Sequence, residues 1–421
     1  MLGAPDLRAQ SLNGELEGLL VSHPEIRAGE RSAQAADEGV RRAFSGYLPK
    51  LDIFGESGPQ YIDSPVLKSQ GGGAWSTIAQ VAGAQLTQKV FDGFATPSQI
   101  RSARLNLEVA EFTLAGTVQA VLFEGISAYI EVLRQNRLVD LARESETTIM
   151  HQLRLEDERV QRGSGIAVDV LQAKSRLQVA KERRVGFEGG LADATTRYIQ
   201  VFGHPPEIGA MTAPQTPTGL LPGDLAQTLE LARQENPAID SSLANVAIAD
   251  EKKRLVRSEY YPTLDIVARA DRENDNDLVQ GTRTDASVVL SARWNLFSGF
   301  STAAGLKQAG LDYKVARENH DLLARKLDEE TRLAWNDWAT ARRRVELLDN
   351  AVAIASEVFD ARHKLREAGR ETVINVLDAE NEVYNARISL TQASGDETLS
   401  AFRLLQAVGR LRPEDLGLSQ P

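Results

Sequence analysis

The stretches GYLPKLDIF (residues 46–54) and EYYPTLDIV (residues 259–267) are near copies of each other, 213 positions apart. Each contains a tyrosine, a proline two residues later and then Leu-Asp-Ile. The likeness extends upstream, because residues 22–53 align without a gap on residues 235–266. In that alignment Ala36-Asp37-Glu38 recurs as Ala249-Asp250-Glu251. A likeness of this length indicates an internal repeat.

The repeat continues downstream with a separation of 206 positions. Glycines and aromatic residues match at this spacing: Phe91 and Phe297, Gly163 and Gly369, Gly203 and Gly409. The seven-residue change in spacing falls between Pro49 and Phe91, in a stretch containing SQGGGAW. Variation in length belongs in a surface loop. We therefore predict two structural repeats, residues 1–210 and 211–421, that together form one fused protomer.

Each repeat is predicted to begin with a helix, continue as two strands and end as a long helical hairpin. Alternation with period two predicts strand pairs at about 48–92 and 262–297. The segments between the strands, GESGPQYIDSPVLKSQGGG and DRENDNDLVQGTRTD, are rich in Gly, Ser, Pro or acidic residues and are predicted to be long solvated loops. Three-four spacing of apolar residues predicts coiled-coil hairpins at about 97–202 and 302–409. The predicted fold is mainly α with a small β part.

Composition excludes several classes of function. The net charge of −11 argues against a nucleic-acid partner, because phosphates would be repelled. The chain has no cysteine, so it has neither disulfides nor thiol catalysis. We find no nucleophile–base arrangement, no metal-ligand spacing and no phosphate-binding glycine loop, and we expect neither enzymatic activity nor a cofactor. No window of about 20 apolar residues stands out, so no membrane-spanning helix is expected. The first residues lack the pattern of a signal peptide, which is therefore expected to be absent or already removed.

The predicted strands raise a problem of closure. Each carries one apolar and one polar face, and a sheet with open edges is not tolerated in lipid. Two chains would give an eight-strand barrel filled by side chains, whereas three would give twelve strands and space for a lumen. We therefore expect several copies to share one wall, with these residues facing lipid: Leu51, Ile53, Leu264, Ile266, Leu290 and Trp294.

The order and spacing of these features resemble the TolC family of outer-membrane efflux and secretion channels. The likeness rests on YLPKLDI with YYPTLDI, on FDGF with FSGF, and on GSGIAVDVLQAKS with GRETVINVLDAENEVYNAR, and it covers essentially the whole chain. It implies a homotrimer in the outer membrane of a Gram-negative cell, with a helical barrel in the periplasm. It also implies a periplasmic adaptor and, through it, an inner-membrane ABC or RND pump.

The resemblance also implies roles for residues near the two helical turns. Asp169 and Asp378 would form carboxylate rings at the periplasmic aperture, where Asn375 and Glu371 occupy positions that are acidic and basic in the family. The hairpin turns would dock the adaptor, through Gly163, Ser164, Gly165, Gly369 and Arg370. The alternative is that the acids are ordinary solvated helix charges and the glycines are ordinary helix caps.

Two questions stay open at this stage. The exported substrate could be a small toxic molecule or, slightly favoured, an unfolded polypeptide in type I secretion. A different class of function is a soluble or periplasmic coiled-coil scaffold or adaptor. An adaptor has one helical hairpin, however, and a soluble scaffold has no use for strands with an apolar outer face.

Overall fold

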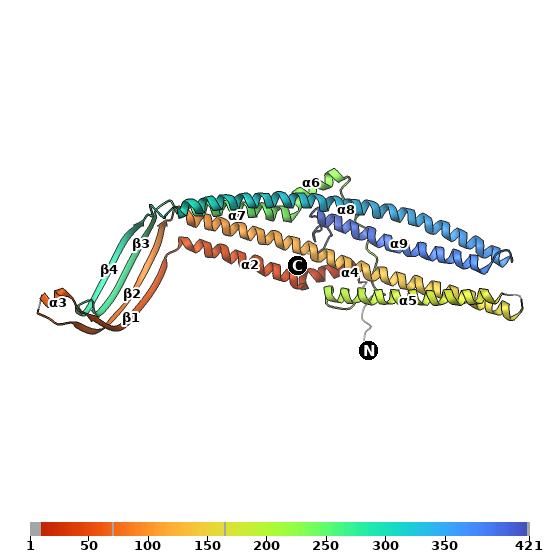
Figure 1. Cartoon of the computed structure of the whole chain (residues 1–421), viewed down its shortest axis with the longest axis horizontal. Helices are drawn as coiled ribbons and strands as arrows, with labels where there is room; N and C mark the ends of the chain where they lie inside the picture. Colours follow the sequence, from red (N-terminus) through yellow and green to blue (C-terminus); the bar gives the residue numbers. More distant parts are fainter. Residues whose placement is uncertain (1–9, 70, 164–165, 419–421) are drawn as a thin grey trace, which may run out of the picture. The chain divides into compact units, whose positions relative to one another are not determined.

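The computed structural model describes residues 10–69, 71–163 and 166–418. Figure 1 labels the main elements. In chain order they are α1 (Leu12–Ser22), α2 (Pro24–Phe44), η1 (Ser45–Tyr47), β1 (Lys50–Ile62), α3 (Pro65–Ser69), β2 (Trp75–Phe91), α4 (Ala95–Gln161), α5 (Ala167–Phe202), η2 (Thr218–Leu220), α6 (Leu225–Glu235), α7 (Pro237–Ser258), β3 (Thr263–Asn276), β4 (Val279–Arg293), α8 (Ser301–Glu367) and α9 (Val373–Ala407). The chain divides into two compact units, and α2, α4, α7 and α8 each contribute to both.

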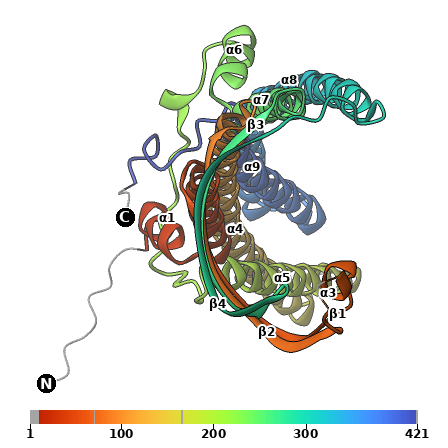
Figure 2. The same cartoon turned by 90° about the vertical axis from the view of Figure 1, so that its left-hand side faces the viewer.

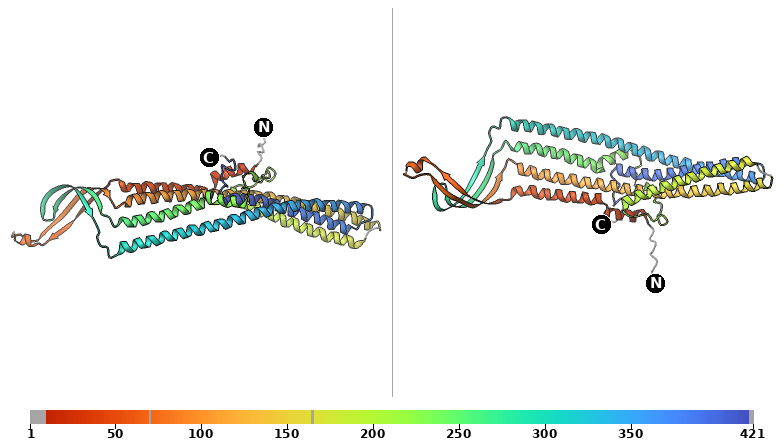
Figure 3. Two further views of the ribbon diagram at one scale, coloured as in Figure 1. Left: turned by 90° about the horizontal axis from the view of Figure 1, so that it is seen from above. Right: turned by 60° about the horizontal axis from the view of Figure 1, so that its bottom comes forward.

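The first unit comprises residues 1–30, 113–239 and 323–421. Within it α4 and α5 run antiparallel as one helical hairpin, and α8 and α9 as another (Figure 3). Buried residues recur with three-four spacing, as the sequence predicts: Val170, Ala173, Leu177 and Ala180 on α5, and Val376, Ala379 and Val383 on α9. The small alanines in this seam permit close approach of the helices. The main core lies where α1, α4, α5 and the end of α9 meet, around Leu16, Leu122, Tyr129, Tyr198 and Leu405.

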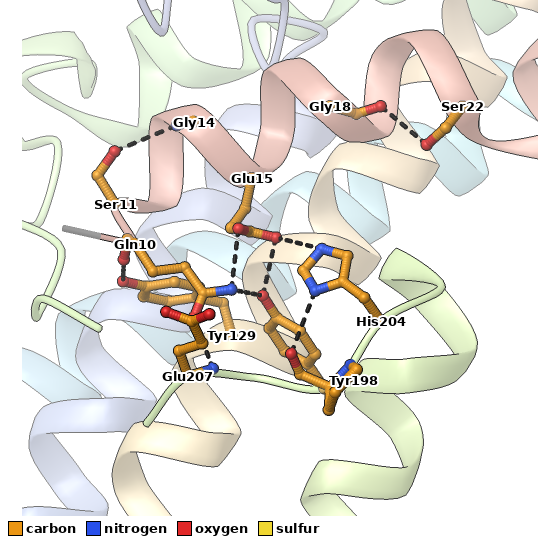
Figure 4. A network of polar contacts seen from close by, with 11 residues as sticks. Gln10, Ser11, Gly14, Glu15, Gly18, Ser22, Tyr129, Tyr198, His204 and Glu207 are labelled. Carbon is orange, nitrogen blue, oxygen red and sulfur yellow. Dashed lines mark hydrogen bonds and ion pairs between the residues drawn. The ribbon is translucent and has the colours of Figure 1, made fainter. Parts of the chain in front are cut away.

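A polar network closes one side of this core (Figure 4). The hydroxyl of Tyr198 donates to a Glu15 carboxylate oxygen at 2.8 Å. The pKa of Tyr198 is raised mainly by burial and, to a smaller extent, by this carboxylate, so the phenol keeps its proton. Gln10 donates to the same hydroxyl at 3.0 Å. The hydroxyl of Tyr129 lies 2.7 Å from the Gln10 carbonyl oxygen and accepts from the Thr212 amide at 3.0 Å. These bonds tie the beginning of the described chain and the segment after α5 to the long helix α4.

The end of α9 requires a glycine. Gly409 has a φ of +79°, and its N–H donates to the Gln406 carbonyl while Arg410 donates to Leu405, which is the Schellman arrangement. A Cβ at this position would lie 2.3 Å from the carbonyl oxygen of Glu235 at the end of α6. The chain therefore turns against α6 so closely that no side chain fits between them.

The second unit comprises residues 31–112 and 240–322 and contains the sheet. Its four strands are antiparallel in the order β1-β2-β3-β4, and Figure 2 shows them as one curved sheet. The helical parts of this unit also contact one another. Arg101 of α4 donates to Glu251 of α7 at 2.9 Å, and Ser242 of α7 lies 3.3 Å from the His320 ring of α8.

The predicted long loops between the strands are wrong. β1 continues to Ile62, where a short helix follows, and β3 and β4 are joined by only Asp277 and Leu278. Both of these residues have positive φ, which is the backbone twist that a two-residue hairpin turn demands. The backbone groups of polar residues form the same interstrand hydrogen bonds as those of apolar residues. A polar sequence therefore did not show where the strands end.

The elements recur with the repeat. α4 and α8 have 67 residues each, α5 and α9 have 36 and 35, and α1 and α6 have 11 each. The sequence did not predict α1 or α6. The two compact units do not coincide with residues 1–210 and 211–421, because each unit takes elements from both repeats. The division into those two repeats therefore stays a prediction about sequence organisation.

Candidate functional site

The register of the sheet places a row of apolar residues from all four strands on one surface, although Phe54, Val267 and Val289 lie on the other. Leu51 pairs with Leu86, Leu86 with Ala268, and Ala268 with Val288, and paired residues share a face. Applied along all four strands, this defines an apolar face that contains Leu51, Ile53, Ala84, Leu86, Leu264, Ile266, Ala268, Val288 and Leu290. Ile53 is 82% exposed and Leu290 is 68% exposed. The sheet thus presents large apolar side chains outward.

Trp294 differs from the other residues predicted to face lipid. It follows β4, one residue after the strand ends, and its ring nitrogen donates to the Tyr260 carbonyl oxygen at 3.1 Å. The indole is nevertheless 59% exposed. An exposed aromatic ring with its N–H satisfied is typical of a membrane–water interface.

The opposite surface of the sheet, which we call the polar face, carries charged residues that pair with one another. It contains Asp52, Gln85, Arg269, Asp271, Glu273, Arg283, Asp285, Ser287 and Ser291. Arg269 donates to Asp271 at 2.9 Å, and Arg283 lies 2.9 Å from Glu273 and donates to Asp285 at 2.7 Å. The three carboxylates therefore have cationic partners, and their closeness needs no metal ion.

The sheet has two open edges. Among the described residues, β1 pairs only with β2, and β4 pairs only with β3. An edge strand presents a row of unpaired N–H and C=O groups, which must be satisfied by another strand where water is absent. A second copy of the chain can supply such a strand.

The turn between α4 and α5 holds the first set of predicted residues. Gly163 has a φ of +78° and donates its N–H to the Val160 carbonyl, as a helix cap does. Ser164 and Gly165 lie outside the described residues. Asp169 stands in the first turn of α5, half-buried, where the helix dipole favours a negative charge. Its carboxylate has no hydrogen-bond or ion-pair partner among the described residues.

The turn between α8 and α9 holds the second set. Gly369 has a φ of +73° and donates to Arg366, while the Arg370 N–H donates to Leu365, in the Schellman arrangement. Glu371 accepts from the Asn375 side chain at 2.5 Å and from a backbone amide at 2.9 Å. The hydrogen bond from Asn375, which has the larger effect, and the one from the backbone amide hold the pKa of Glu371 below its usual range. The hydrogen bonds between Glu371 and Asn375 thus stabilise the N-terminus of α9.

Polar contacts link the two hairpins to each other near these turns. Arg176 of α5 donates to Asp378 of α9 at 2.5 Å. Glu156 of α4, whose side chain is 3% exposed, accepts from Arg366 of α8 at 2.5 Å. Asp378 is therefore paired with a cation, whereas Asp169 has no such partner in the described part of the chain. The aperture role of the acids and the docking role of the turn glycines remain predictions.

The sequence analysis missed Glu156, Arg176 and Arg366. One signal for Glu156 exists, because it continues the three-four spacing of Ile149 and Leu153 and so places an acid in an apolar seam. A buried carboxylate in a seam requires a cation nearby. The sequence does not say which of the 48 lysines and arginines supplies it.

The expectation that no helix is apolar enough to span a membrane was too strict. Within the described residues, α4 contains an 18-residue window that is long and apolar enough to cross a membrane by length and composition. Residues in this part of α4 form the main core, including Leu122, Ile126 and Tyr129. Part of the apolar surface of α4 is therefore packed in the core, although only 28% of that window is buried.

Comparison with known proteins decides the family. A family model described as outer membrane efflux protein matches residues 16–204 and 228–410, once in each half of the chain. The chain belongs to the outer membrane efflux protein family. It is 24% identical to the outer membrane efflux protein BepC of Brucella suis biovar 1, over 97% of this chain and 88% of BepC. It is also 24% identical to the outer membrane protein TolC of Escherichia coli K12, over 97% of this chain and 84% of TolC.

Structural comparison agrees on the fold. The solved structure of the outer-membrane channel OprN superposes with a TM-score of 0.83, at 17% identity, over 94% of this chain and 89% of OprN. The predicted TolC-like fold and outer-membrane location are thus confirmed, and the scaffold alternative is not favoured. The family member described here is an outer-membrane exit channel. Its relatives are channels and not enzymes, and they include the proteases secretion protein PrtF of Dickeya chrysanthemi, 23% identical over 99% of this chain and 91% of PrtF.

Proposed function

We propose that three copies of this channel protein close one wall around a shared lumen. The observation that supports this most directly is a four-stranded sheet with an apolar face, a polar face and two open edges. Joining β4 of one copy to β1 of the next gives a head-to-tail contact that closes into a ring. Three copies supply twelve strands, with the apolar face toward lipid and the polar face toward water.

The helical hairpins would continue this duct through the periplasm toward an adaptor protein and an inner-membrane pump. The resemblance to TolC-type channels implies these partners, and the turns at Gly163 and Gly369 offer exposed backbone at the hairpin ends. The duct itself would be passive, so the energy for export comes from the pump. The exported substrate would be either small molecules or secreted polypeptide, since relatives named for efflux and for secretion both match.

The gate would depend on the contacts between the two hairpins of one protomer. Arg176–Asp378 and Glu156–Arg366 each join an α4/α5 residue to an α8/α9 residue. Opening would require the hairpins to separate near the turns, and both ion pairs must break for that. The more buried pair, Glu156–Arg366, would contribute most to the closed state, because low dielectric strengthens its attraction.

The number of copies can be tested by cross-linking, because the chain has no native cysteine. Asp52 on β1 and Ser287 on β4 lie in one row across the polar face, through Gln85 and Arg269. We expect the double variant Asp52→Cys, Ser287→Cys, treated in outer membranes with a bismaleimide, to give denatured products of one, two and three chains and no larger. The Asp52→Cys variant alone should give no three-chain product. A ladder of the double variant that ends at two chains would contradict the proposal.

Asp169 provides a test of the aperture. If three Asp169 carboxylates face the pore, then Asp169→Asn should lower the cation-over-anion permeability ratio of the reconstituted channel several-fold, because the ring of negative charge is removed. Asp193→Asn, the same change farther along α5, is the control and should leave the ratio near wild type. Equal ratios in wild type and Asp169→Asn would place Asp169 outside the aperture.

A further inference from the structure

The surface of the sheet that carries the apolar face becomes polar near the hairpin turns. On β3 this surface holds, in order toward the β3–β4 turn, Leu264, Ile266, Ala268, Ala270, Arg272 and Asn274. The first four are apolar and the last two are polar. The other strands are polar in the row of Asn274 as well, where Ser57, Gln80 and Thr282 lie. We call the polar end of this surface the outer polar patch and define it as Ser57, Gln80, Arg272, Asn274, Thr282 and Thr284.

The position of the patch matches the outer boundary of the apolar band of a membrane barrel. The helices α2, α4, α7 and α8 lead into or out of the sheet at the Leu264 end, and the hairpin turns lie at the other end (Figure 1). The helical part lies in the periplasm, so the turns lie on the outer side. Arg272 is eight residues after Leu264. That is roughly 27 Å along a strand, or roughly 20 Å along the membrane normal at a tilt of about 40°, against an apolar band about 25 Å tall. With the apolar face toward lipid, Arg272 therefore lies at the level of the outer headgroups.

Arg272 is a cation without a protein partner. Its side chain is exposed and has no hydrogen-bond or ion-pair partner among the described residues. By contrast, Arg269 and Arg283 on the polar face both pair with carboxylates. An arginine toward lipid costs free energy in the hydrocarbon but little at the interface, where its long side chain reaches the headgroups. The guanidinium of Arg272 is thus available to an anion of the membrane surface.

An open depression of about 420 Å³ in the same surface provides space beside this guanidinium. The residues that line it from this side of the sheet are Gly55, Ser57, Gln80, Ala82, Arg272 and Asn274. Gly55 and Ala82 leave space because their side chains are small. The other four supply a hydroxyl, two side-chain amides and the guanidinium, all of which can donate hydrogen bonds. The acid in the described lining, Glu56, alternates to the polar face. The depression therefore combines space with donors suited to an oxyanion.

We propose that the outer polar patch binds the phosphate group of a phosphorylated lipid of the outer leaflet, such as lipid A. Arg272 donates two N–H groups to the phosphate oxygens, in the bidentate geometry that a guanidinium favours. The side chains of Ser57, Gln80 and Asn274 donate to the remaining oxygens. The acyl chains of the same lipid lie along the adjoining apolar face, which a free phosphate ion cannot contact. The inference rests on the proposed orientation of the apolar face toward lipid.

Native mass spectrometry of the purified, detergent-solubilised full chain tests the site, with diphosphoryl lipid A as the probe. We expect wild type to retain at least one lipid A per chain. Lipid A from which both phosphates have been removed should be retained about tenfold more weakly, because a hydrogen bond to a charged group is lost. Inorganic phosphate at the concentration of the lipid should not displace it, and displacement would identify a site for the free ion instead.

Two variants separate this site from general surface charge. Arg272→Gln should weaken the retention of diphosphoryl lipid A about tenfold, since the charged donor is removed. Arg293→Gln is the control, because Arg293 is also exposed and its side chain also lacks a partner among the described residues, but it lies on the polar face at the opposite end of the sheet. It should retain lipid A as wild type does, and both variants should assemble in outer membranes like wild type. The proposal is overturned if wild type retains no lipid A, if removal of the phosphates changes nothing, or if Arg272→Gln retains as much as wild type.

The cross-linked ladder of Asp52→Cys, Ser287→Cys reports on the channel separately. A three-chain ladder together with undiminished lipid retention in Arg272→Gln would reject the lipid site and keep the wall of three copies. A two-chain ladder would reject that wall whatever lipid the chain retains.

Discussion

Replacing Leu290 by arginine is expected to lower the amount of channel assembled in the outer membrane by more than tenfold. Leu290 pairs with Ile266 on the apolar face, and its side chain is 68% exposed. An arginine on the lipid face of a barrel costs about 2–4 kcal/mol near the bilayer midplane. Since each of three proposed copies carries the change, the penalty is incurred three times in one assembly.

The control uses the same substitution one residue farther along. Ser291 lies on the polar face, paired with Asp265, so Ser291→Arg should leave an arginine in water. Assembly is measured as the fraction of protein recovered in outer membranes as a species that dissociates only on heating. If Leu290→Arg and Ser291→Arg assemble equally well, then the apolar face does not meet lipid.

The second large effect is expected at the ion pair between Glu156 and Arg366. Replacing Arg366 by serine should raise the single-channel conductance several-fold and lower the stability of the closed state. Breaking a buried pair by removing one partner typically costs about 3–5 kcal/mol, because the remaining charge is buried without compensation. Here Arg159, on the same helix as Glu156 and 3.1 Å away, reduces that cost. It does not bridge to α8, so the link between the hairpins is still lost.

Arg162 provides the matched control. It pairs with Glu158 one turn earlier on α4, and its side chain is 77% exposed. Arg162→Ser therefore removes the same charge near the turn of the other hairpin, without breaking a contact between hairpins, and an exposed pair contributes about 1 kcal/mol or less. The single-channel conductance of both variants is measured in planar bilayers. Arg366→Ser channels that keep the wild-type conductance would show that this pair does not hold the gate.

Much of the fold could be predicted from local patterns. The predicted hairpin at about 97–202 compares with α4 and α5 from Ala95 to Phe202, since three-four spacing acts within one helix pair. The loops between strands were predicted wrongly, because polar residues such as those of DRENDN (residues 271–276) can lie in a strand whose hydrogen bonds to the next strand satisfy the backbone. The helices α1 and α6 were missed, and each has only 11 residues, too few for a clear period.

The candidate site shows the same division. Period two predicted that Leu51, Ile53, Leu264, Ile266 and Leu290 are the apolar side of their strands, and the register places them on one face. The acids near the hairpin turns were named from the resemblance to the TolC family, which does not predict what surrounds them in this chain. Asp169 and Asp378 are both expected at the aperture, yet among the described residues only Asp378 has a cationic partner, Arg176, which lies 202 positions away in the sequence.

The sequence by itself determined that this protein is a duplicated unit of paired strands and long helical hairpins, with one apolar strand face that a lone chain cannot cover. Periodicity is a property of neighbouring residues, and the repeat is found by aligning two stretches of the same sequence, so neither requires the tertiary structure. Only the tertiary structure decided that Glu156 and Arg366 meet and that Leu51, Leu86, Ala268 and Val288, from four strands, share one face. Such pairings depend on how helices and strands distant in the chain approach and rotate, which no local pattern encodes.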